Sequence, residues 1–62
     1  MYRILDRRGR YLARDRVPCE WSPSRESAVG YALADEARRV IARLWSSGSI
    51  RRAVGARVVY EA

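Results

Sequence analysis

The chain contains no lysine and no histidine, so all thirteen of its basic residues are arginine. Without histidine or lysine, the usual general base and the usual nucleophilic amine of enzymes are missing, and the sequence does not predict an enzyme. Phenylalanine, asparagine, glutamine and threonine are also absent, a bias that GC-rich codon usage would produce. Codon usage explains arginine in place of lysine. It does not explain a net charge of +6, because aspartate and glutamate remain available and total only seven.

Cysteine is nearly absent, since Cys19 is the only one. A lone cysteine cannot close an intrachain disulfide, and no neighbouring residue completes a zinc site. No lysine or histidine is present to generate a reactive thiolate, so we interpret Cys19 as a half-buried small apolar residue. We therefore expect no metal, no cofactor and a reducing, cytoplasmic setting.

Long hydrophobic runs are absent as well, and none approaches the roughly 18 residues that a membrane span needs. We expect neither membrane insertion nor secretion. A chain of 62 residues forms at most one domain, residues 1–62, and buries only about 60% of its unfolded surface. Because the core is small, a homodimer or a partner that completes it is also expected.

The first part of the chain predicts a hairpin with strands at 2–6 and 10–14. Asp6 opens the turn and Gly9 closes it at the point where a left-handed backbone is needed, which is typical of a type I turn with a bulge. The residues between them would form an exposed tip.

The middle of the chain is harder to interpret. Residues 17–21 are a candidate third strand, where a proline is tolerated only at a sheet edge. We favour a short helical turn at 24–28, followed by an extended pair at 30–31. The alternative is one long helix over 23–47, which would place Gly30 in its interior.

Residues 33–46 have the clearest helical pattern. Asp35 lies in the first turn, where a negative charge suits the helix dipole, and it is spaced for an ion pair with Arg39. We interpret the polar side as a solvated face and Gly48 as the terminal cap. The apolar residues recur on one face, at Leu33, Ala37, Val40, Ile41, Leu44 and Trp45.

A last strand at 56–61 completes an α+β fold, in which a small antiparallel sheet of three to four strands packs against one main helix. Alternation along the strands gives the sheet two faces. The face turned away from the helix would display Arg3, Leu5, Tyr11, Arg57 and Val59.

Nine of the thirteen arginines lie in the first 16 or last 15 residues, and they form one basic surface if the two ends pair in space. Arginine interleaved with tyrosine on an open sheet is a platform for phosphates and stacked bases of DNA or RNA. Arginine and tyrosine also anchor interfaces with proteins, here an acidic protein surface or a nucleoprotein complex. The residues expected to bind the partner are Arg3, Arg7, Arg8, Arg10, Tyr11, Arg14, Arg51, Arg52 and Arg57.

The layout resembles small accessory proteins of phages and mobile elements, including anti-CRISPR proteins. The shared pattern is a hairpin, a strand with tryptophan, a helix with an aromatic, spacer, Glu-Ala start, and a closing strand. It is carried by 2–6, Gly9, 10–12, Trp21, Ala28, Tyr31, 35–37, Val40, Ala42, Leu44 and 56–59.

This resemblance implies a non-enzymatic, phage-encoded inhibitor that occludes a surface of a bacterial defence complex. It carries over no functional residues. Many anti-CRISPR proteins are acidic DNA mimics, and the charge of +6 departs from that mode. The partner would then be an acidic protein surface or the nucleic acid of the complex. The alternative is a nucleic-acid-binding accessory protein that uses the basic sheet and hairpin.

Overall fold

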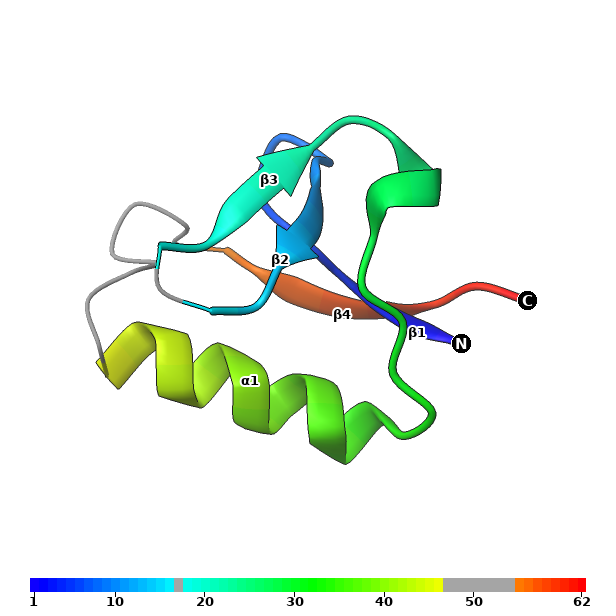
Figure 1. Ribbon diagram of the computed structural model, residues 1–62. Coiled ribbons are helices and arrows are strands. Elements are labelled where there is room, and N and C mark those ends of the chain that lie inside the picture. Colours follow the sequence, from blue (N-terminus) through cyan, green and yellow to red (C-terminus); the bar gives the residue numbers. More distant parts are fainter. Residues whose placement is uncertain (17, 47–54) are drawn as a thin grey trace.

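The described part of the protein is an antiparallel sheet with one long helix against it (Figure 1). The computed structural model describes residues 1–16, 18–46 and 55–62. The strands lie in the order β3-β2-β1-β4, which confirms the predicted α+β fold. The third strand lies at an edge, but it spans Glu20–Ser22 instead of 17–21, so Pro18 precedes it. The elements are β1 Tyr2–Leu5, β2 Tyr11–Arg14, β3 Glu20–Ser22, the 3₁₀ helix η1 Arg25–Ser27, α1 Ala34–Ser46 and β4 Arg57–Tyr60.

The hairpin between β1 and β2 closes as predicted. The Gly9 amide donates to the Asp6 carbonyl at 3.1 Å, and Gly9 has the left-handed φ of 79°. The Asp6 carboxylate accepts the backbone amides of Arg8 and Arg10 at 2.8 and 2.9 Å, a use of Asp that is common in turns. The predicted cap Gly48 lies outside the described residues.

The segment before α1 is extended and fills the space where β1 and β2 separate. Tyr31 and Tyr2 exchange two backbone hydrogen bonds of 2.8 and 2.9 Å, while the Val29 amide donates to the Leu12 carbonyl at 3.0 Å. A Cβ at Gly30 would collide with the side chain of Met1. The short helical turn and the extended residues at 30–31 are therefore confirmed, and the single long helix is excluded.

The core lies between α1 and the strands β1 and β4. Cys19 is half-buried and packs against it, as predicted. Two residues that the sequence places on the apolar face of the helix are instead exposed: Leu33 by 61% and Trp45 by 54%. The buried cluster consists of Ile4, Leu12, Tyr31, Ala37 and Leu44.

The helix contact explains these differences. Because α1 begins at Ala34, Leu33 precedes the helix and is not part of its apolar stripe. Ala37 and Leu44, two turns apart, lie along the line that touches the sheet, while Trp45 lies beside that line. Leu5 differs in the other direction, since it is buried although alternation places it on the open face.

Candidate anion-binding arginine clusters

The two ends of the chain pair in space, because β4 runs antiparallel to β1 from Tyr2–Tyr60 to Leu5–Arg57. The predicted arginines among the described residues lie at the hairpin tip, on the open sheet face and at the end of β2. Arg51 and Arg52 lie outside the described residues.

The first group surrounds the hairpin turn, and we call it the tip cluster. Asp6 lies at its centre and is only 4% exposed. Arg10 Nε contacts Asp6 Oδ2 at 2.8 Å, and Arg57 Nη1 donates to the Asp6 carbonyl at 3.3 Å. The cluster consists of Arg7, Arg8, Arg10 and Arg57.

Asp6 is held as a carboxylate by its hydrogen bonds. Burial raises its pKa, but the donors supplied by the Arg10 amide, the Arg10 guanidinium and the Arg8 amide outweigh burial and keep the pKa below its ordinary value. Asp6 thus fixes two of the four arginine side chains, Arg10 through its carboxylate and Arg57 through its backbone carbonyl.

The other two arginines of the tip cluster are Arg7 and Arg8. Within the described residues, the side chains of Arg7 and Arg8 make no hydrogen bond or ion pair, and both residues are exposed. The stem of Arg7 nevertheless has a neighbour, since a Cβ placed on Gly55 would lie 2.7 Å from Arg7 Cγ. The tip is therefore packed against the approach to β4 while its two outer charges face solvent.

In Asp6→Asn, the free energy of unfolding is expected to fall less steeply as the pH is lowered. A carboxyl group whose pKa is lower in the folded than in the unfolded chain stabilises the fold at pH values above its unfolded pKa. This contribution is lost as the pH falls through the folded pKa. The variant loses the ion pair with Arg10 but keeps an oxygen for the two amides. Urea unfolding between about pH 2 and pH 7 measures this. Asp35→Asn, which removes an exposed pair with Arg38, is the control and should leave the profile nearly unchanged.

The second group lies on the open sheet face, where the side chains turn inward to Glu61. Tyr11 donates its hydroxyl to Glu61 Oε2 at 2.7 Å. Arg3 Nε and Arg25 Nε lie 3.7 and 3.3 Å from Glu61 Oε1. The hydrogen bond to Glu61 is the main cause that raises the pKa of Tyr11. We call these four side chains the Glu61 network.

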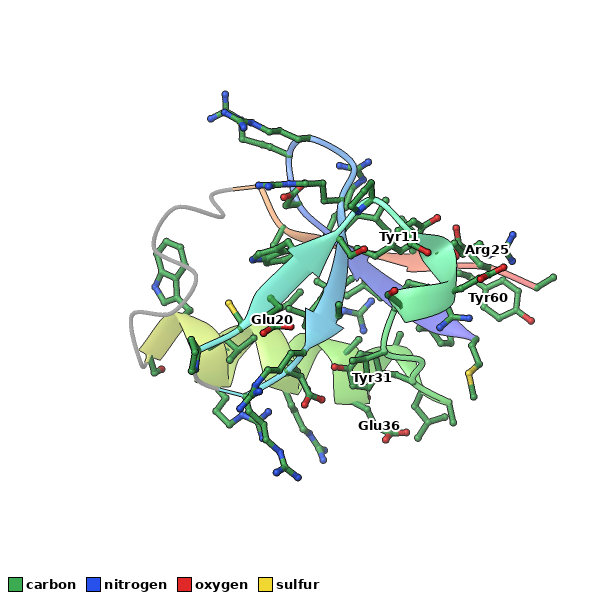
Figure 2. The ribbon with its side chains drawn as sticks, turned by 45° about the horizontal axis from the view of Figure 1, so that its top comes forward. Tyr11, Glu20, Arg25, Tyr31, Glu36 and Tyr60 are labelled. Atoms are coloured by element: carbon green, nitrogen blue, oxygen red, sulfur yellow. The ribbon has the colours of Figure 1, made fainter. Side chains whose placement is uncertain are left out.

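The Glu61 network involves side chains that the alternation along the strands places on the open sheet face. Arg3 also donates to the Ala28 carbonyl at 3.0 Å, and Arg25 of η1 donates to the Ala62 carbonyl at 3.1 Å. Figure 1 shows η1 and α1 on opposite sides of the sheet, and Figure 2 shows Tyr11 and Arg25 at the same end of it. Arg3 and Tyr11 are therefore half-buried and hold partners within the fold.

The third group, which we call the helix-side cluster, lies where the residues that follow β2 contact α1. Tyr31 donates its hydroxyl to Asp15 Oδ2 at 2.9 Å, and Arg43 of α1 donates to the Asp15 carbonyl at 2.6 Å. Burial and this hydrogen bond raise the pKa of Tyr31 well above its ordinary value. The cluster consists of Arg43, of Arg14 and Arg16 on either side of Asp15 in the chain, and of Arg39 one turn before Arg43 on α1, all exposed.

Sequence reasoning assigned only Arg14 of this cluster to the site. Arg39 and Arg43 are one turn apart on the same stripe of α1, a spacing visible in the sequence, but the contact with Asp15 is not. The predicted ion pair between Asp35 and Arg39 is wrong, because Asp35 pairs with Arg38 at 3.0 Å. Arg39 is left without a hydrogen bond or ion pair among the described residues.

Other kinds of site have little support in the described ranges. No group of three His, Cys, Asp or Glu residues there is placed to hold a metal ion. No helix in the same ranges has the length and apolar character to cross a membrane. No protein-family model matches the chain, and no curated protein or solved structure is significantly similar to it. A functional assignment must therefore come from the arginine clusters.

Proposed function

We propose that the chain is a non-enzymatic binding protein that docks its hairpin tip on an acidic protein surface. The tip cluster carries this proposal. Two of its arginines are fixed by buried Asp6, and the other two, Arg7 and Arg8, are exposed and have no side-chain partner within the described residues. Guanidinium groups bind carboxylates through two parallel hydrogen bonds, so a supported pair suits a cluster of acidic side chains.

The choice of a protein partner follows from what surrounds the tip. Residues 6–10 include no aromatic side chain on which a base would stack. The tyrosine nearest to them in sequence, Tyr11, directs its hydroxyl to Glu61. An inhibitor of a bacterial defence complex, of the anti-CRISPR kind, is the concrete form of this proposal, since a protruding basic tip would occlude an acidic surface.

A nucleic-acid backbone is the second candidate partner, and the helix-side cluster favours it. Two of its four arginines lie at the end of β2 and just after it, and the other two lie on α1. The hydrogen bond from Arg43 to the Asp15 carbonyl joins these two segments. Phosphate contacts need charge and reach but no aromatic platform. Glu20 lies opposite Arg14 in the sheet and lowers the positive potential on one side of this cluster.

Salt dependence separates the two partners. If four arginines contact duplex phosphates, affinity should fall roughly 150-fold between about 50 and 200 mM salt, because the slope is near −0.9 per phosphate. We expect no such binding to generic DNA or RNA in a gel-shift titration, and a stable complex with a purified defence effector in size-exclusion chromatography. Micromolar binding with the steep slope would favour the second candidate. Failure with every effector of the host would contradict inhibition.

A further inference from the structure

The two edges of the sheet differ in how well they are protected from pairing with another strand. β3 has three residues, lies between Pro18 and Pro23, and shifts register against β2. Short length, proline and irregular register all discourage edge pairing. β4 has four residues, Arg57–Tyr60, without proline or glycine, and its outer side is unpaired among the described residues.

The hydrogen bonds of β4 show which backbone groups face outward. Met1 and Glu61 exchange bonds of 2.7 and 2.8 Å, so Glu61 directs its backbone groups to β1. Because this direction alternates along a strand, Val59 and Arg57 also face β1. Val58 and Tyr60 therefore direct their amides and carbonyls to the free edge.

We propose that the free edge of β4 pairs antiparallel with β4 of a second copy, with Val59 opposite Val59. In this register Val58 and Tyr60 of one copy face Tyr60 and Val58 of the other as hydrogen-bonded pairs, as the outward groups require. Arg57 then lies opposite Glu61 of the second copy, twice by symmetry. A register shifted by two residues would also pair the outward-facing backbone groups, but Arg57 would no longer lie opposite Glu61 of the second copy.

The side chains support the same register. Tyr60 is 66% exposed in one copy, and its ring is held by an edge-to-face contact with Tyr2 at 5.1 Å and 68°. In the dimer this ring covers Val58 of the second copy, an aromatic and β-branched pair that stabilises antiparallel strands. The proposal shares Arg57 with the tip cluster but does not depend on which partner Arg7 and Arg8 bind.

Cysteine crosslinking tests the register directly. In a Cys19→Ala background, Val59→Cys places two thiols at a non-hydrogen-bonded pair, where the Cα atoms are about 4.5 Å apart and a disulfide is allowed. We expect disulfide-linked dimers to form at least roughly tenfold faster than with Val58→Cys or Arg57→Cys, whose positions do not face themselves. Equal rates at all three positions would overturn the proposal.

Sedimentation equilibrium of the unmodified chain tests the dimer itself. Arg57→Glu places like charges opposite each other twice, so the dimer dissociation constant should rise about tenfold or more. This variant also loses the hydrogen bond to the Asp6 carbonyl, so circular dichroism must show that it is folded. Arg57→Gln should have a smaller effect, and Arg16→Glu, with the same change in net charge, should have almost none. A chain that stays monomeric up to about 1 mM would overturn the proposal and leave the edge for a strand of another protein.

Discussion

Reversal of Arg7 and Arg8 to glutamate is expected to weaken binding to the acidic partner at least about 100-fold. An arginine at the centre of an interface costs about 2 kcal/mol or more when it is lost, and about 1.4 kcal/mol corresponds to a factor of ten. The reversal also adds repulsion. The fold should persist, because neither side chain makes a hydrogen bond or ion pair within the described residues. Isothermal titration calorimetry measures the affinity, and circular dichroism checks the fold.

The double reversal of Arg14 and Arg16 is the matched control, since it changes the net charge by the same amount. It should alter binding to the acidic partner only severalfold, and it should abolish binding to nucleic acid if the helix-side cluster contacts phosphates. Equal losses from the two reversals would show that the partner responds to net charge and not to the tip.

Arg10 must be left out of the tip reversal. Glutamate at this position would lie beside the buried carboxylate of Asp6, which now accepts three donors from Arg8 and Arg10. The resulting repulsion would disturb the turn, so a loss of binding would no longer report on the partner. From the sequence alone Arg7, Arg8 and Arg10 look equivalent.

Local signals account for most of the fold that sequence reasoning predicted. Asp6 and Gly9 stand three residues apart with the chemistry that the turn needs, and helical spacing defines α1 to within a residue. Both features depend on residues that are only a few positions apart in the sequence. The edge position of the third strand was expected from Pro18, although β3 begins only at Glu20 and Pro18 lies outside it.

The candidate site was less predictable because its side chains choose partners far away in sequence. Alternation places Tyr11 and Arg3 on the open face, but the carboxylate of Glu61 that receives them comes from the other end of the chain. The contact between Arg43 and Asp15 likewise depends on how α1 crosses the sheet. No pattern in the sequence contains these distances, so the partners of these side chains could not be predicted from it.

The apolar stripe of α1 was predicted correctly in position but not in width. Periodicity shows which side of a helix faces the core, whereas contact with the sheet decides how much of that side is covered. Leu44 is 1% exposed and Trp45 is 54% exposed, although the sequence gives both to the same stripe. This difference between adjacent residues has a large energetic consequence.

Leu44→Ala should destabilise the protein by about 2–5 kcal/mol, because it leaves a cavity where the side chain was fully buried. A domain of 62 residues has a total stability of roughly 3–9 kcal/mol, so the variant would be largely unfolded or would melt tens of degrees lower. Trp45→Ala removes a larger side chain yet should cost less than about 1 kcal/mol, because half of it already faces water. Thermal unfolding followed by far-UV circular dichroism compares the two. Equal losses would place Trp45 in the core and contradict the helix contact described above.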